Sequence, residues 1–233
     1  KLLINQNKGG FAFVKKDDIL IKKELKSNNF KSKIIKVDTK KNNKIFKKVN
    51  NNYFLTENNK ENLSFILEIV KKLKIQKNLL IKSLKDFKGL RYRQQIIFKN
   101  SKLTIINDSK STSFSSSIGV LKVNPNIYWL IGGVYKEGDQ FYLDKKYYKN
   151  IKAFIYGKNK GFFKKKLLGK IQYQNFDSLK DALKEIFDII KKEKFKNRTI
   201  LFSPCAASFD SFKNFEDRGL YFNKLVKKYV NKI

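Results

Sequence analysis

The stretch that decides the fold is Ile127–Gly133, with the sequence IYWLIGG. Five apolar residues in succession, followed at once by two glycines, are typical of a strand that is buried on both faces and ends in a tight turn. Three similar apolar runs lie elsewhere in the chain, at Leu103–Ile106, Ala153–Tyr156 and Thr199–Phe202. Strands that are apolar throughout are typical of parallel sheets covered on both sides.

Helical segments separate these apolar runs. The clearest one begins after Ser178, and Asp181 three residues on completes the pattern of a helix N-terminus. Its apolar residues recur at helical spacing: Leu179, Ala182, Leu183, Ile186, Phe187 and Ile190. A last helix is expected around Phe222–Tyr229. Strands and helices that alternate in this way predict an α/β fold with a mostly parallel sheet.

The part of the chain before Gly89 has a different pattern. Short strands are expected in the first 50 residues, at Phe11–Val14, Ile19–Ile21 and Ile34–Val37. Two amphipathic helices follow, over Asn62–Lys74 and Asn78–Phe87, and Gly89 ends the second. The segment Gly89–Arg93 is therefore the predicted domain boundary.

The composition excludes several function classes. The chain has 233 residues, one cysteine (Cys205), no histidine and no methionine. A single cysteine excludes an intrachain disulfide framework, and the absence of histidine argues against a zinc site and a histidine-activated nucleophile. No apolar run approaches the roughly 20 residues of a membrane span, so we expect a cytoplasmic protein without a membrane partner. The missing methionine suggests that translation began further upstream.

The formal net charge of +33 raises the possibility of a nucleic-acid partner. Only four of the 53 Lys and Arg residues are arginines, and the lysines occur as scattered pairs rather than one dense arm. Abundant Lys, Asn, Ile and Phe are what A/T-rich codons encode. We therefore expect no specific nucleic-acid partner, although a non-catalytic basic module that binds nucleotides or nucleic acid remains the alternative function.

Polar sequence follows three of the four predicted strands. These segments are Asn107–Thr112, Gly132–Lys136 and Ser203–Phe215. Taken singly, they could be turns and helix caps. Ligands of open parallel sheets bind beyond the carboxyl ends of the strands, so together the segments suit a carboxylate or phosphate ligand with a ribose. The chain contains no G-x-x-x-x-G-K-[ST] phosphate loop.

The run Ser203–Gly219, SPCAASFDSFKNFEDRG, resembles the C-terminal signature of the D-glutamate-adding ligases of the Mur ligase family. Asn107–Thr112 (NDSKST) resembles the strand-end motif that opens their C-terminal domain. The Gly132–Asp139 segment and Gly89–Arg93 match in order and spacing. The resemblance implies that residues 1–89 form the end of a central α/β ATPase domain. It also implies that residues 90–233 form a whole Rossmann-like C-terminal domain.

The resemblance implies a two-step ligation in cytoplasmic peptidoglycan precursor synthesis. ATP, with Mg²⁺, would phosphorylate the alanine carboxylate of UDP-N-acetylmuramoyl-L-alanine, and D-glutamate would attack the acyl phosphate to form an amide. The full-length enzyme is expected to be a monomer. The phosphate loop and the UDP-binding domain of the family are missing here, so this chain alone is expected to be inactive.

The family resemblance also implies roles for individual residues. ATP would be bound by Asn59, Asn62, Arg93, Asp108 and Lys110. D-Glutamate would be bound by Thr112, Lys136, Ser208, Phe209 and the backbone N–H of Phe215. Catalysis would fall to Lys110, Arg93 and Lys136, and Lys1, as a carbamate, would help to bind Mg²⁺. The chain departs from the family pattern at Thr56 and Asn58, and at Arg91 and Tyr92, where Pro and His are usual.

Overall fold

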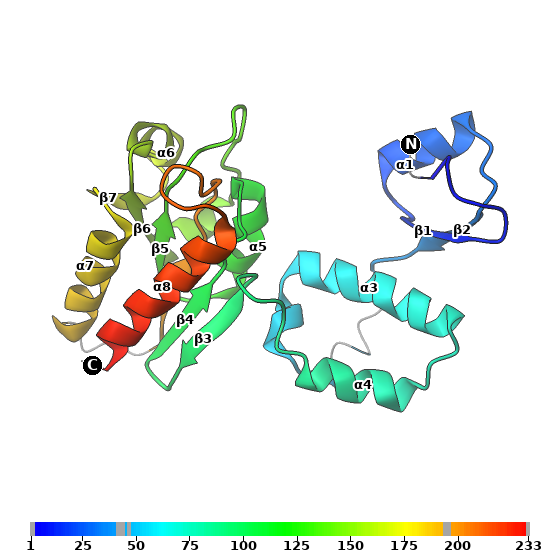
Figure 1. Cartoon of the computed structure of the whole chain (residues 1–233), viewed down its shortest axis with the longest axis horizontal. Coiled ribbons are helices and arrows are strands. Elements are labelled where there is room, and N and C mark those ends of the chain that lie inside the picture. Colours follow the sequence, from blue (N-terminus) through cyan, green and yellow to red (C-terminus); the bar gives the residue numbers. More distant parts are fainter. Residues whose placement is uncertain (1–2, 41–44, 46–47, 193–196, 232–233) are drawn as a thin grey trace. The chain divides into compact units, whose positions relative to one another are not determined.

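The computed structural model describes residues 3–40, 45, 48–192 and 197–231, and the chain divides into two compact units, residues 1–87 and 88–233 (Figure 1). Each unit is described by itself. No helix in the described ranges is both long enough and apolar enough to cross a membrane.

The second unit is built on a six-stranded sheet in the order β3-β4-β8-β5-β6-β7. The strands are β3 (Gln95–Lys99), β4 (Leu103–Asn107), β5 (Ile127–Ile131), β6 (Ile151–Tyr156), β7 (Gln172–Phe176) and β8 (Arg198–Phe202). Only β3 is antiparallel to its neighbour. The predicted α/β class with a mostly parallel sheet is confirmed, as are the four predicted strands. The two edge strands, β3 and β7, were not predicted.

Helices cover both faces of this sheet (Figure 1). They are α5 (Phe114–Val123), α6 (Lys160–Leu167), α7 (Leu179–Lys192) and α8 (Phe215–Val230), with a short 3-10 helix η2 at Lys145–Asn150. Side chains of β5 alternate between the two apolar layers. Trp129 packs in the layer with α5 and α6, whereas Tyr128 and Leu130 pack in the layer with α7 and α8. This alternation explains why the strand is apolar throughout.

The cap predicted for α7 is confirmed. The backbone N–H of Asp181 donates to Ser178 Oγ at 3.1 Å, and the Ser178 hydroxyl donates to the Asp181 carboxylate at 2.6 Å. One otherwise unpaired backbone N–H group at the start of the helix is thereby satisfied, and the second bond holds the capping hydroxyl in place.

The first unit has a smaller framework. Strands β1 (Phe11–Lys15) and β2 (Lys33–Val37) form a parallel pair, joined by helix α1 (Ile19–Ser27). A 3-10 helix η1 (Asn52–Leu55) and helices α3 (Glu57–Lys72) and α4 (Lys77–Asp86) follow. The small core of the helical part consists of Val49, Phe54, Leu63 and Leu84.

Two expectations for the first unit are wrong. Ile19–Ile21 is the start of helix α1 and not a strand, because Asp18 Oδ1 accepts the N–H of Ile21 at 3.0 Å and so caps a helix. The helix predicted over Asn62–Lys74 is α3, which begins at Glu57 rather than at Asn62, because Thr56 acts as its N-cap. In both cases a capping side chain decides the boundary, and the apolar pattern does not reveal it.

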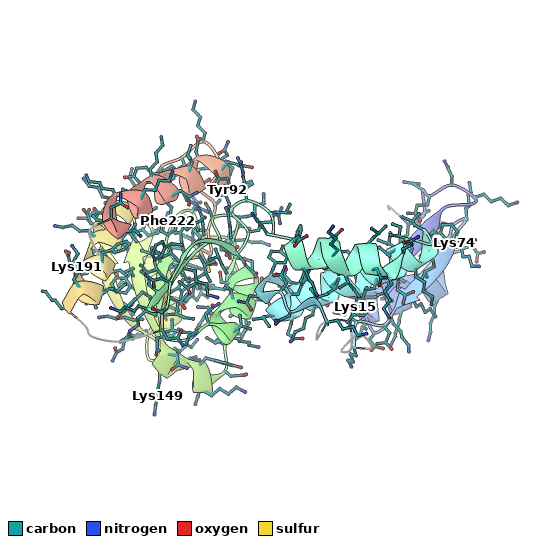
Figure 2. The ribbon with its side chains drawn as sticks, turned by 90° about the horizontal axis from the view of Figure 1, so that it is seen from below. Lys15, Lys74, Tyr92, Lys149, Lys191 and Phe222 are labelled. Carbon is teal, nitrogen blue, oxygen red and sulfur yellow. The ribbon has the colours of Figure 1, made fainter. Side chains whose placement is uncertain are left out.

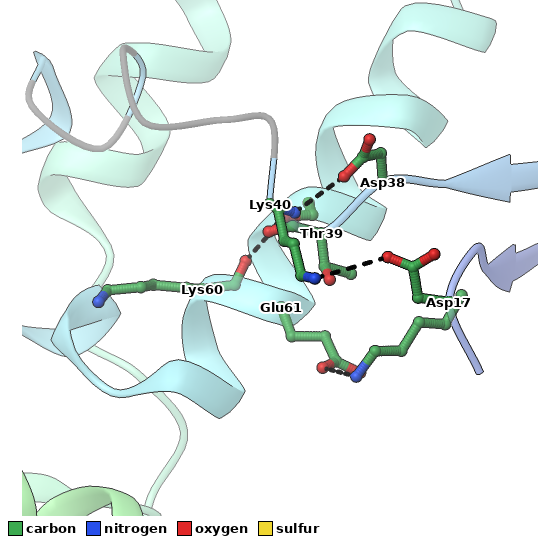
Figure 3. A network of polar contacts seen from close by, with 8 residues as sticks. Asp17, Asp38, Thr39, Lys40, Lys60 and Glu61 are labelled. Atoms are coloured by element: carbon green, nitrogen blue, oxygen red, sulfur yellow. Dashed lines mark hydrogen bonds and ion pairs between the residues drawn. The ribbon is translucent and has the colours of Figure 1, made fainter. Parts of the chain in front are cut away.

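Polar contacts link β1, α3 and the segments that follow the two strands within the first unit (Figure 3). Lys15 Nζ lies 2.5 Å from Glu61 Oε2, and Lys40 Nζ lies 3.8 Å from Asp17. The Ser64 hydroxyl donates to the Lys60 carbonyl at 3.1 Å. The Lys40–Asp17 pair is exposed and the Lys15–Glu61 pair is half-buried. Exposed pairs typically stabilise a fold by about 0–1 kcal/mol each.

Lysines dominate the outside of both units. Long side chains such as Lys149 and Lys191 extend away from the ribbon, whereas Phe222 of α8 is buried (Figure 2). The charge therefore lies on the surface and leaves the apolar layers intact.

Candidate functional site

The candidate site lies at the carboxyl edge of the sheet in the second unit. Strands β4, β8 and β5 are adjacent and parallel, so their carboxyl ends meet at one edge. The three polar segments, Asn107–Thr112, Ser203–Phe215 and Gly132–Lys136, leave from these ends. The expectation that they converge is confirmed by their hydrogen bonds.

Backbone hydrogen bonds join the three segments to one another. Ala206 N–H donates to the Ser111 carbonyl at 3.3 Å, and this bond connects the loops after β8 and β4. Val134 and Ala207 exchange two bonds of 2.9 and 2.8 Å, and these connect the loops after β5 and β8. The loops are therefore one hydrogen-bonded assembly.

The glycine pair after β5 allows this close approach. A Cβ on Gly132 would lie 2.3 Å from the Tyr156 carbonyl oxygen, and one on Gly133 would lie 2.5 Å from the Ala207 carbonyl oxygen. Gly133 also has a φ of +128°, which residues with a side chain rarely adopt. The two glycines thus do more than make a tight turn, because the absence of side chains lets the backbone at Tyr156 and Ala207 pack directly against them.

Asp108 lies at the centre of the assembly and is almost fully buried. Its Oδ1 accepts the N–H of Gln94 at 3.0 Å, and its Oδ2 accepts the Ser203 hydroxyl at 2.7 Å. Burial raises the pKa of Asp108 to about 7, although both hydrogen bonds and the charges of Arg93 and Arg218 oppose the rise. Each carboxylate oxygen is thus already engaged within the protein.

Lys110 and Phe215 lie together at this edge. Lys110 Nζ is 3.8 Å from the centroid of the Phe215 ring, at cation–π distance. The Phe215 carbonyl accepts the Ser109 hydroxyl at 2.8 Å, so the start of α8 is fixed to the loop after β4. Asn214 caps α8 by accepting the N–H of Asp217.

The remaining predicted site residues of the second unit differ in exposure. Thr112, Lys136 and Arg93 are exposed, as is Phe209, whose side chain is 75% accessible. Ser208 is buried. Asp139, in the same loop as Lys136, accepts the N–H of Phe114 at 2.8 Å and so attaches this loop to α5.

The predicted adenine-binding residues lie in the first unit, on α3. Asn59 is buried, and its Nδ2 donates to the Tyr53 carbonyl at 2.6 Å. Asn62, one turn further along, is exposed. Lys1 lies outside the described residues. Within the described ranges, no three or more His, Cys, Asp or Glu side chains form a group that could hold a metal ion.

Cys205 lies in the loop after β8 and is buried in the apolar layer with α5. Burial raises the pKa of its thiol well above the ordinary value. This environment is that of a packing residue, as expected, because reactive cysteines need a lowered pKa and access to solvent.

Sequence reasoning missed Arg218 on α8. Its side chain is 1% accessible, which is rare for arginine. The signal was present in the chain, because Arg218 falls on the same helical face as Phe222, Leu225 and Val226. A charged residue in an apolar stripe indicates a buried polar contact.

The chain is similar in sequence to curated ligases and in fold to solved structures. No protein-family model matches this chain. It is 35% identical to the UDP-N-acetylmuramoylalanine–D-glutamate ligase of a Wolbachia strain from Brugia malayi, over 73% of this chain and 34% of that protein. It is 36% identical to the ligase of the same name from Francisella tularensis, over 76% of this chain and 42% of that protein. The matches thus span less than half of the length of these relatives.

Solved structures show the same fold at low sequence identity. The UDP-N-acetylmuramate–alanine ligase of Thermotoga maritima matches with a TM-score of 0.50 and 15% identity, over 76% of this chain and 39% of that one. MurF from Acinetobacter baumannii matches with a TM-score of 0.54 and 13% identity, over 75% of this chain and 38% of that one.

Proposed function

This chain belongs to the Mur ligase family, and from that premise we propose that it forms part of an ATP-dependent ligase that adds D-glutamate to UDP-N-acetylmuramoyl-L-alanine. The reaction would take place in the cytoplasm, in peptidoglycan precursor synthesis. In this proposal residues 90–233 are the C-terminal domain, and residues 1–89 are the end of the central ATPase domain.

One observation carries the proposal. Three strand-end loops are hydrogen-bonded into one assembly, and their side chains include the ammonium groups of Lys110 and Lys136 and the hydroxyls of Thr112 and Ser208. Ammonium and hydroxyl groups on a common edge are suited to a small ligand with carboxylates. Glutamate carries two carboxylates, so separate loops can each hold one of them.

The D-glutamate contacts are assigned by loop. Lys136 and Thr112 would hold the α-carboxylate. Ser208 and the backbone N–H of Phe215, in the first turn of α8, would hold the side-chain carboxylate, since helix N-termini favour anions. Phe209, exposed beside Ser208, would line the same site.

The chemistry consists of phosphoryl transfer followed by acyl transfer. An oxygen of the alanine carboxylate would bond to the γ-phosphorus of ATP, the bond to the β-phosphate oxygen would break and ADP would leave. The amine nitrogen of D-glutamate would then attack the carbonyl carbon. The C–N bond forms, the C–O bond to phosphate breaks, phosphate leaves with the electron pair and the amine gives up a proton. Lys110 and Arg93 would neutralise the charge on the transferred group. Positioning and charge stabilisation suffice, and no protein nucleophile is needed.

The nucleotide contacts are also assigned to individual residues. Asn62 and Asn59 would contact adenine, and Asp108 would accept from the ribose hydroxyls with lone pairs left over from its bonds to Gln94 and Ser203. Mg²⁺ bound to the phosphates would neutralise their charge, and Lys1 as a carbamate would be its ligand from this chain.

A titration of the 233-residue chain tests the proposal. D-Glutamate is added to ¹⁵N-labelled protein, with L-glutamate as the stereochemical control. Lys136→Ala should weaken D-glutamate binding about tenfold, since a charge-assisted hydrogen bond contributes about 1.5–3 kcal/mol. Lys122→Ala is the matched control, because Lys122 is exposed on the last turn of α5, away from the strand ends. Equal binding of both enantiomers, or equal affinity of the two variants, would rule out the assigned contacts.

A further inference from the structure

Arg218 makes contacts that no predicted role accounts for. Its Nε donates to the Ser109 hydroxyl at 3.1 Å, and its Nη2 donates to the carbonyls of Ser109 at 2.7 Å and Ala206 at 2.9 Å. All three bonds are buried. One planar guanidinium on α8 therefore joins the loop after β4 to the loop after β8, with the fork geometry that arginine provides.

The charge of Arg218 is not neutralised by an ion pair within the described part of the chain. Its Nη1 is buried and has no hydrogen-bond partner among the described residues. That nitrogen would lie 3.1 Å from a Cβ on Gly133, so it faces the glycine turn after β5. Burial lowers the pKa of Arg218. A buried cation without an ion-pair partner among the described residues is costly to the fold, although the nearby Asp210 and Asp108 offset part of the cost. A role in stability alone does not account for it.

The three loops that meet at this guanidinium are those that bear the proposed ligand contacts. Ser109 immediately precedes Lys110, and Ala206 lies two residues before Ser208. Ala207 pairs with Val134, which lies two residues before Lys136. Lys110 and Ser208 thus each lie within two residues of a carbonyl group to which Arg218 donates. Lys136 is connected less directly, through Ala207, the neighbour of Ala206, and its pairing with Val134.

We propose that Arg218 is the positioning residue of the glutamate site, which sets the spacing of Lys110, Lys136 and Ser208 through the Ser109 and Ala206 carbonyls. This inference rests on the proposed function. It assigns to Arg218 no contact with substrate. Lysine cannot replace it, because one ammonium group cannot make the same forked set of bonds to Ser109 and Ala206.

The deciding variant is Arg218→Lys, which keeps the charge and removes the fork. Arg198→Lys is the matched control, since Arg198 opens β8 at the opposite edge of the sheet. Two readouts are taken on the full chain at a temperature where both variants are folded. They are the D-glutamate affinity by NMR titration and the hydrogen exchange of the Val134, Ala206 and Ala207 amides.

Arg218→Lys should weaken D-glutamate binding at least tenfold and speed exchange at the three loop amides. Exchange in the central strands should stay unchanged, and Arg198→Lys should behave like the wild type. A purely structural role would lower the unfolding temperature and leave the affinity of the folded chain intact, which would overturn the inference.

The wild-type titration and the variant measurements together separate this inference from the proposed function. If the wild type binds no D-glutamate, the proposed function fails, and Arg218 as the residue of a glutamate site fails with it. If the wild type binds and Arg218→Lys leaves both the affinity and the loop exchange unchanged, only the positioning role is overturned. Arg218→Met, which removes the charge as well, should give a larger loss if it folds, and Arg218→Lys decides the question if it does not.

Discussion

The two compact units bury their polar groups in different ways. In the second unit, most buried polar side chains gather at the carboxyl edge of a sheet that is covered on both faces: Asn107, Asp108, Ser109, Ser111, Ser117, Ser203, Ser208 and Arg218. In the first unit, a half-buried ion pair between Lys15 and Glu61 joins a two-stranded pair to helix α3. The buried polar side chains of the first unit are uncharged: Ser32, Thr56, Asn59 and Ser64. Two apolar layers can compensate for the cost of burying Asp108 and Arg218, which is larger. The comparison therefore indicates which unit can carry a preorganised site.

The largest expected effect comes from removing the centre of an apolar layer. Trp129 is fully buried and donates its Nε1–H to the Ser203 carbonyl at 2.8 Å. Trp129→Ala should destabilise the second unit by about 3–5 kcal/mol. Leu63→Ala, in the core of the first unit, should cost about 2–5 kcal/mol there. Denaturant unfolding followed by NMR signals from each unit measures both. Equal loss in both units from either variant would contradict two separate cores.

The next effect concerns pH and the buried carboxyl at the edge. The pKa of Asp108 is raised from 3.8 to about 7, so between these values the folded state holds a proton that the unfolded state has lost. This contribution to stability is complete below about pH 4 and is lost as the pH rises to about 7, at up to about 1.4 kcal/mol per pH unit.

Asp108→Asn removes this titration while keeping a similar shape. The free energy of unfolding, wild type minus variant, should fall between pH 4 and 7 and be flat above pH 7.5. Asp177→Asn is the control, because Asp177 is exposed and its pKa is lowered by its ion pair with Lys160. A difference that is constant with pH would show that Asp108 is ionised across the range.

The smallest effects are expected at matched helix caps, one in each unit. Ser178 caps α7 with a 3.1 Å bond, and Thr56 caps α3 with a longer bond of 3.4 Å. Loss of an N-cap typically costs about 1 kcal/mol. Ser178→Ala should destabilise only the second unit, and Thr56→Ala should destabilise only the first, by a smaller amount. Thermal unfolding of the two variants measures both losses of stability. A larger loss for Thr56→Ala than for Ser178→Ala would contradict the prediction.

The sequence pattern predicts the centre of the second unit well and its edges poorly. Strands β4, β5, β6 and β8 are apolar because both faces are covered, and that pattern is unambiguous. The edge strand β7, with the sequence QYQNF, is partly exposed, so its residues carry no apolar run. In the first unit, Ile19–Ile21 looks like a strand, and only Asp18 as a cap reveals the helix.

The candidate site could likewise be predicted only in part from the sequence pattern. Convergence of the three polar segments follows from parallel strands alone, and so it could be predicted. The burial of Asp108, with both oxygens engaged, depends on Gln94 and Ser203 from distant parts of the chain. The contacts of Arg218 with Ser109 span 109 positions in the sequence. A local pattern cannot encode such pairings, because they arise only when the strand order is fixed.

The most direct test of the central claim is to map D-glutamate onto the chain by amide chemical shifts. If the carboxyl edge of the second unit is the glutamate site, the shifts should concentrate at Thr112, Lys136, Ser208 and Phe215, and L-glutamate should reproduce them weakly. They should persist at 0.3 M salt. Shifts spread over surface lysines of both units, equal for the two enantiomers and lost in salt, would contradict the claim and indicate only non-specific anion binding.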